Sequence, residues 1–114
     1  KVSGAFHSPL MEPAKDGLAQ RLGRTEPADP RFPVVSNVTA EPVREAGEVM
    51  SLLVRQLTSP VRWSASVASM VASGADRFVE LGPGRVLCGL NRRNARGMPC
   101  TSVGAPEDLD DVDA

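Results

Sequence analysis

The sequence predicts an α/β fold in which short parallel strands alternate with helices. Three observations support this prediction. In several stretches apolar residues recur at three- and four-residue steps, as they do on one face of a helix. Short runs rich in β-branched residues lie between those stretches. Ten glycines and ten prolines in 114 residues mark the boundaries between the two kinds of segment.

The first predicted helix follows His7, the only histidine of the chain. Ser8 is the expected N-cap, and Pro9 is the expected first helical residue. The apolar face of this helix consists of Leu10, Met11, Ala14, Leu18 and Leu22. We expect the helix to end near Gly23, and a proline-broken connection over 24–33 to follow it.

A short strand is expected over 33–38, with a turn-prone segment over 39–42 after it. Asn37 closes this strand, and we interpret it as a turn residue that bonds its own backbone, with a functional role as the alternative. A second helix is predicted over 45–57, and its apolar face carries one polar residue, Gln56. Its amide is either exposed to solvent or buried with a partner, because an unpaired buried amide costs about 1–3 kcal/mol.

The remaining predicted elements are a helix over 63–73 ended by Gly74, a strand over 78–81, a helix that carries Val86, Leu87 and Leu90, a strand over 99–103, and an acidic tail over 107–113. The turn Gly82-Pro83-Gly84 joins a strand to a helix, an arrangement that can present backbone N–H groups to a ligand. Neither phosphate-binding fingerprint is present there, so we interpret the turn as mainly structural.

Composition excludes several classes of function. The net charge of −1, the 4% aromatic content and the absence of Tyr argue against a nucleic-acid partner. No apolar run approaches the roughly 18 residues of a membrane span. Cys88 and Cys100 lack metal-ligand spacing, so we expect free buried thiols in a reducing cytosol, and neither a metal nor a cofactor.

His7 is the residue best suited to chemistry. An imidazole can take and return a proton near neutral pH. A lone histidine is more often a surface or structural residue, and that alternative stays open. Small or apolar neighbours and an irregular loop, marked by Ser3 and Gly4 before it and Pro9 after it, favour a functional role.

Residues 4–11, GAFHSPLM, resemble the histidine motif of the malonyl-CoA:acyl carrier protein transacylases. Three later segments are similar to family motifs in the same order and spacing: 33–38, 53–63 and 80–87. The resemblance implies that residues 1–114 are a single region, the C-terminal part of an α/β-hydrolase-like acyltransferase core. The G-x-S-x-G elbow that holds the family's nucleophile is absent from the chain. The serine, the oxyanion donors and the arginine that grips the malonyl carboxylate are therefore expected outside it.

The resemblance implies malonyl transfer from malonyl-CoA to the phosphopantetheine thiol of acyl carrier protein, in fatty acid biosynthesis, by a cytoplasmic enzyme that is monomeric when complete. His7 would be the general base, and the backbone carbonyl of Gln56 would replace the usual triad carboxylate. Phe6 would exclude a methyl branch on the substrate, with a plain packing role as the alternative. Val86 would line the acyl pocket.

Two other functions remain open. The chain could be an acyltransferase domain fragment of a polyketide synthase, although residues 106–114 resemble a chain end and favour a stand-alone enzyme. It could also be a non-catalytic fragment that retains the fold, which the missing nucleophile supports. Arg92, Arg93 and Arg96 are either a solvated helix end or a docking patch for an acidic carrier protein or the phosphates of coenzyme A.

Overall fold

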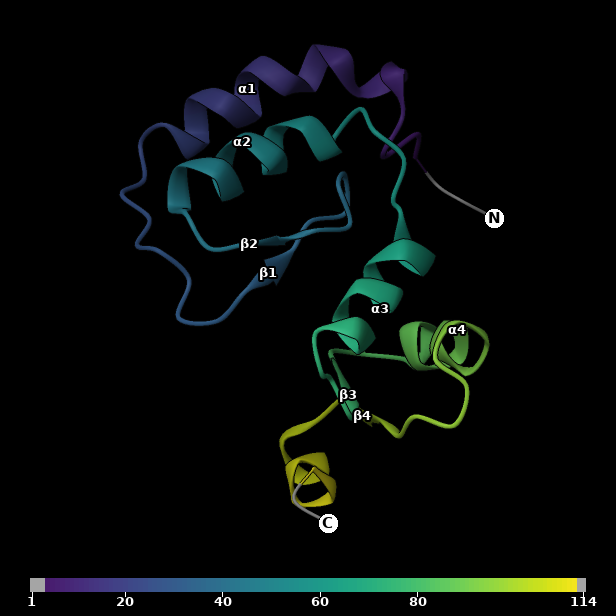
Figure 1. The fold of residues 1–114 in the computed structure, drawn as a ribbon. Coiled ribbons are helices and arrows are strands. Elements are labelled where there is room, and N and C mark those ends of the chain that lie inside the picture. The colour runs from purple at the N-terminus through teal and green to yellow at the C-terminus, as the bar shows by residue number, and fades with distance from the viewer. Residues whose placement is uncertain (1–3, 113–114) are drawn as a thin grey trace. The chain divides into compact units, whose positions relative to one another are not determined.

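The computed structural model describes residues 4–112. The chain divides between Ser66 and Val67 into two compact units, and this division falls within helix α3, Trp63–Ala72 (Figure 1). None of the helices within the described residues is both long enough and apolar enough to span a bilayer.

Two helices lie side by side in the first unit, α1 over Glu12–Leu22 and α2 over Ala46–Gln56 (Figure 1). A 3₁₀ turn, η1 over Pro9–Met11, leads into α1, and the Ser8 hydroxyl caps that turn by accepting a hydrogen bond from the Leu10 N–H at 3.3 Å. Proline has no N–H to donate and is tolerated only in the first turn of a helix, which is where it occurs here. Both predicted helices are present, and α2 lies within one residue of its expected ends. The first helix was expected to begin at Pro9, but residues Pro9–Met11 are a 3₁₀ turn and the α-helix begins at Glu12.

A short hairpin completes the first unit. Strand β1, Val34–Val35, pairs antiparallel with β2, Pro42–Val43, so that Val34 lies opposite Val43. The sequence indicated only a turn over 39–42, and the expectation of parallel strands is wrong for this pair. The connection over 36–41 is too short for the crossover that a parallel pair requires. The buried apolar residues of this unit are Ala40, Val43 and Leu52.

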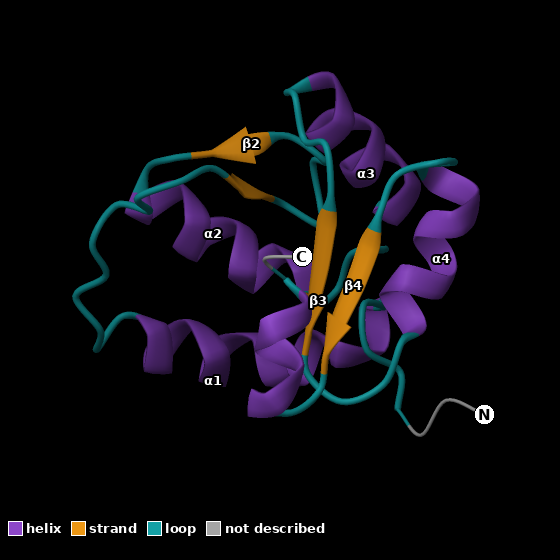
Figure 2. Ribbon diagram, turned by 90° about the horizontal axis from the view of Figure 1, so that it is seen from below, coloured by secondary structure: helices purple, strands orange, loops and turns teal. Residues whose placement is uncertain are grey.

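The second unit is a β-α-β arrangement (Figure 2). Strand β3, Phe78–Leu81, leads through helix α4, Val86–Asn94, to strand β4, Cys100–Val103. The two strands are parallel and in register from Phe78↔Cys100 to Leu81↔Val103, as the α/β prediction requires. The buried apolar residues are Val67, Cys88, Ala95 and Val103. The acidic tail forms a 3₁₀ helix, η2 over Pro106–Asp111, and the end of the predicted tail at 113 lies outside the described residues.

The carboxylate of Glu80 caps the start of α4. One of its oxygens accepts from the Leu87 N–H at 3.0 Å and the other from the Cys88 N–H at 2.9 Å. The N–H of Cys88, and next that of Leu87, lower the pKa of Glu80 below its ordinary value because they favour the charged form. Gly82 and Gly84 have φ of 123° and 97°, which explains why glycine occupies both positions. The helix N-terminus is thus satisfied by the chain itself, which supports a structural interpretation of the turn.

The expectation of free thiols is wrong, because Cys88 and Cys100 form a disulfide with their Cα atoms 5.5 Å apart. Cys88 lies in the first turn of α4 and Cys100 begins β4. Helix α4 packs against both strands, and this packing brings the two cysteines together across a separation of 12 residues. No local pattern indicated the bond, since the two cysteines lie in unlike sequence contexts.

Candidate active site

His7 contacts the C-terminal end of α2. Its Nδ1 lies 2.8 Å from the backbone carbonyl oxygen of Gln56, and both residues are half-buried. A carbonyl oxygen can only accept a hydrogen bond, so Nδ1 carries the proton in this contact. In the neutral ring Nε2 is then unprotonated and available as a base.

The Gln56 carbonyl is available because Gln56 is the last residue of α2. The final carbonyls of a helix have no intrahelical donor. Ser59 N–H bonds the same oxygen at 3.3 Å in a tight turn that ends before Pro60. The oxygen therefore accepts from both Ser59 and His7, one bond for each lone pair, and its direction is defined by both.

The backbone of His7 has a φ of 58°, in the left-handed region that residues other than glycine seldom adopt. The Ser8 hydroxyl holds the chain on both sides of this residue. It donates to the Ala5 carbonyl at 2.7 Å and accepts from the Leu10 N–H at 3.3 Å. Such strain persists where the surroundings over-determine it, and it is found preferentially at functional sites.

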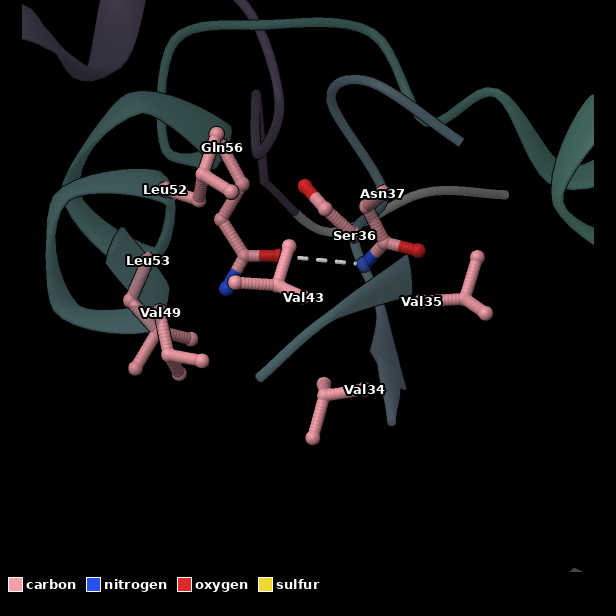
Figure 3. A pocket seen from close by; sticks show the side chains of 9 residues that line it. All are labelled: Val34, Val35, Ser36, Asn37, Val43, Val49, Leu52, Leu53 and Gln56. Carbon is pink, nitrogen blue, oxygen red and sulfur yellow. Dashed lines mark hydrogen bonds between the residues drawn. The ribbon is translucent and has the colours of Figure 1, made fainter. Parts of the chain in front are cut away.

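The side chain of Gln56 is paired with Asn37. The Asn37 Nδ2 donates to the Gln56 Oε1 at 3.0 Å, a bond visible in Figure 3. The expectation that Asn37 would bond its own backbone is wrong. Ser36 does this instead, because its hydroxyl accepts from the Val38 N–H at 3.1 Å. The Gln56 amide was expected either to face solvent or to be buried with a partner, and the structure shows it with a partner, Asn37.

The Asn37–Gln56 pair lies at the edge of a cavity of about 240 Å³ between α2 and the hairpin. Figure 3 shows the side chains that surround it. Six of them are aliphatic: Val34, Val35, Val43, Val49, Leu52 and Leu53. The other three, Ser36, Asn37 and Gln56, are polar, and the backbone of Gln56 also contacts His7. The described residues contain no cluster of His, Cys, Asp and Glu that could hold a metal ion.

Comparison with known proteins shows what this chain is similar to. No protein-family model matches the chain. The malonyl CoA-acyl carrier protein transacylase of Bacillus subtilis strain 168 is 39% identical over 110 residues, which cover 96% of this chain. The crystal structure of the enzyme termed MCAT from Mycobacterium tuberculosis superposes with a TM-score of 0.91 at 39% identity, over 99% of this chain.

The chain is similar to part of the malonyl-CoA:acyl carrier protein transacylases. It spans 35% of the length of the Bacillus transacylase and 37% of the Mycobacterium tuberculosis chain. A third transacylase is described as bound to a type II polyketide synthase acyl-carrier protein, and it superposes with a TM-score of 0.87 at 39% identity, over 96% of this chain and 35% of its own. The α/β fold class predicted from the sequence is thus confirmed as that of part of the transacylase fold.

Two residues that the transacylase resemblance singled out lie outside the cavity. Phe6 is 63% exposed, and its ring lies so close to Gly4 that a Cβ there would come within 2.7 Å of it. Val86 is 69% exposed at the start of α4, in the second unit. Their roles in substrate selection remain predictions. Arg92 and Arg93 lie exposed in the last turn of α4, where cations suit the carbonyl end of a helix.

Sequence reasoning missed two contributions, the bond from Asn37 to Gln56 and the cap that Glu80 provides. A polar residue within the apolar stripe of α2 was the one signal for the first, because a buried amide requires a partner. The cap had no local signal, since Glu80 lies on the preceding strand rather than next to the helix.

Proposed function

We propose that the chain is the histidine-bearing part of a malonyl-CoA:acyl carrier protein transacylase whose nucleophilic serine lies outside these residues. One observation carries the proposal, the 2.8 Å contact of His7 Nδ1 with the Gln56 carbonyl. This contact leaves the other ring nitrogen free as a base, in a chain 39% identical to part of a transacylase.

In the first half of the proposed reaction, His7 Nε2 takes the proton of the serine hydroxyl as the serine oxygen attacks the thioester carbonyl of malonyl-CoA. The carbon–sulfur bond then breaks and the thiol of coenzyme A leaves with the proton that His7 carries. The product is a malonyl-serine ester. The Gln56 carbonyl, acting as the orienting group, holds the ring and stabilises the imidazolium that forms between the two steps.

In the second half the same groups act on the carrier protein. His7 Nε2 takes the proton of the phosphopantetheine thiol, and the sulfur attacks the malonyl-serine ester. The serine oxygen leaves and regains a proton from His7, so that the enzyme returns to its starting state. A neutral base with a fixed tautomer suits both halves, because each begins with proton removal.

The partners that follow are malonyl-CoA and an acyl carrier protein, for a cytoplasmic enzyme that acts as a monomer in fatty acid biosynthesis. A similar transacylase has been solved in complex with a type II polyketide synthase carrier protein, so polyketide synthesis is the alternative pathway. A carrier protein of either pathway would present the same phosphopantetheine thiol, so the chemistry at His7 is common to both.

The proposal is tested with the natural protein that contains these residues and with its His7→Asn variant. Asparagine tolerates the left-handed backbone of His7 but cannot act as the base. We expect the transfer rate to fall about 10²- to 10⁴-fold, the usual contribution of general acid–base catalysis, with an unchanged melting temperature.

The direct readout is the intact mass after brief incubation with malonyl-CoA. A malonyl adduct on the natural protein, formed far more slowly by the variant, supports the proposal. A folded natural protein that gains no adduct would instead favour a non-catalytic fragment that retains the fold. Equal rates for the natural protein and the variant would remove His7 from the mechanism.

A further inference from the structure

We propose that Asn37 is a positioning residue for His7 and acts on it through the side chain of Gln56. Its catalytic consequence rests on the function proposed above, whereas its effect on the histidine does not. The proposal is based on two hydrogen bonds that Gln56 accepts. Its side-chain oxygen accepts from Asn37 at 3.0 Å, and its backbone oxygen accepts from His7 at 2.8 Å.

Asn37 is itself held in place. Its backbone carbonyl accepts from the Arg62 N–H at 2.9 Å, and the Arg62 guanidinium donates to the Thr39 carbonyl at 3.0 Å. The loop that follows β1 is thus fastened to the segment that leads into α3. Asn37 can therefore serve as a fixed point for the Gln56 amide.

Gln56 needs such a fixed point because it ends a helix. Helix ends fray, and the backbone torsions of the last residue are the least restrained of the helix. The amide of Gln56 borders a largely aliphatic cavity, in which an unpaired amide costs about 1–3 kcal/mol. Without Asn37 the amide would turn toward water, and the backbone carbonyl on the same residue would be held only by its bonds to the Ser59 N–H and to His7.

The catalytic effect follows from geometry. A general base must keep its free nitrogen within hydrogen-bond reach of the proton that it removes, and a displacement of about 1 Å can cost about 100-fold in rate. The Gln56 carbonyl sets the direction of the His7 ring. A residue that fixes this carbonyl therefore influences kcat without contacting the substrate.

The experiment removes the same bond from either side, in the natural protein, with Asn37→Leu, Gln56→Leu and the double variant. Gln56→Leu keeps the backbone carbonyl and loses only the amide. We expect each single variant to lose about 10- to 100-fold in kcat with little change in KM. The double variant should lose no more than the worse single variant, because both substitutions remove one interaction.

A matched control is Thr39→Ala, which removes a turn bond that the Glu41 N–H donates to the Thr39 hydroxyl in the same loop and leaves the Asn37–Gln56 pair intact. It should retain the kcat of the natural protein. A natural kcat in folded Gln56→Leu would overturn the inference, even if Asn37→Leu failed to fold. Losses that multiply in the double variant would also overturn it.

A second readout does not depend on turnover. In protein labelled with ¹⁵N-histidine, His7 is assigned by the signal that is missing from His7→Asn, and the exchange of its Nδ1–H with water is then followed. We expect this exchange to be faster in Asn37→Leu and Gln56→Leu than in the natural protein or Thr39→Ala. Unchanged exchange would overturn the inference. The exchange could be faster in the two variants although the natural protein forms no malonyl adduct. That result would refute the proposed function and leave the positioning role of Asn37 intact.

Discussion

The backbone of His7 is held where few residues other than glycine are found, with φ at 58°. The flanking bonds of Ser8 and the contact with Gln56 supply the restraint that this conformation needs. The strain is local to the residue that carries the proposed chemistry, and that coincidence is typical of functional sites. Substitutions at His7 therefore test the backbone as well as the imidazole, which is why asparagine is a better probe than alanine.

At the neighbouring residue we predict that Phe6→Ser relaxes the rejection of methylmalonyl-CoA. A phenyl ring beside the α-carbon of the bound acyl group would leave no room for a methyl branch. The smaller serine side chain would leave that room. The ratio of kcat/KM for methylmalonyl-CoA over malonyl-CoA should rise about tenfold, the scale of one methyl group in a pocket. An unchanged ratio in the natural protein carrying this substitution would assign Phe6 to packing alone.

The sequence predicted the roles of some single residues but not the hydrogen-bond partners of others. His7 stood out because it is unique, lies in a loop and belongs to a motif. The partner of Asn37 could not be predicted, because its bond to Gln56 spans 19 residues and the local pattern of an asparagine after a strand favours a turn. Side-chain pairing across elements depends on tertiary packing, which residue type alone does not determine.

At the scale of elements, α4 depends on a carboxylate from another element. Its N-cap residue, Arg85, makes no side-chain capping bond, and Glu80 on β3 accepts from two of its first N–H groups instead. The bonds join the strand to the helix across the glycine turn. They also make the start of α4 sensitive to the charge on Glu80.

We therefore predict a pH dependence that Glu80→Gln removes. The pKa of Glu80 is lowered in the folded state, so its contribution is fully present above the ordinary value of 4.5 and is lost as the pH falls through the lower folded value. Melting temperatures of the natural protein and of Glu80→Gln should differ most above pH 4.5 and converge in more acidic buffer. A constant difference across that range would show that the charge has no part in the cap.

Most elements were predictable because their signals are local. The helices α1, α2 and α4 follow apolar periodicity with proline or glycine at their ends. Strand β3 is a short, mainly apolar run, and both β3 and β4 contain β-branched residues and lie next to turns. The second strand of the hairpin was not predictable, because Pro42 and Val43 lie in a segment of turn composition. Their pairing with β1 arises from closure of the loop over 36–41, where the Ala40 N–H bonds the Ser36 carbonyl at 2.8 Å.

At the scale of the whole molecule, each compact unit has a small core of its own. Several large apolar side chains remain exposed in the second unit, Leu81 at 75% and Val86 at 69% among them. The chain spans 35% of the Bacillus relative's length, so a transacylase of that size has further residues that could cover such surfaces. A sequence of this length predicts the elements, but it does not predict which of these exposed surfaces further residues would cover.

We predict that the disulfide contributes measurably to the stability of the second unit. A cross-link that closes a loop of this size stabilises a protein by about 2–4 kcal/mol, mainly by restricting the unfolded chain. Dithiothreitol should lower the denaturant midpoint of the natural protein and leave that of a Cys88→Ser/Cys100→Ser variant unchanged. Alkylation of both cysteines in denatured, unreduced protein would show that the bond is not formed.

The same bond turns α4 and the segment after it into a closed covalent ring. Arg92, Arg93 and Arg96 lie between the two cysteines, and all three are exposed. A protease that cleaves after arginine can therefore open the ring without releasing either piece. Protein cut at one of these sites gains only the mass of one water, and its two pieces separate on a gel only after reduction.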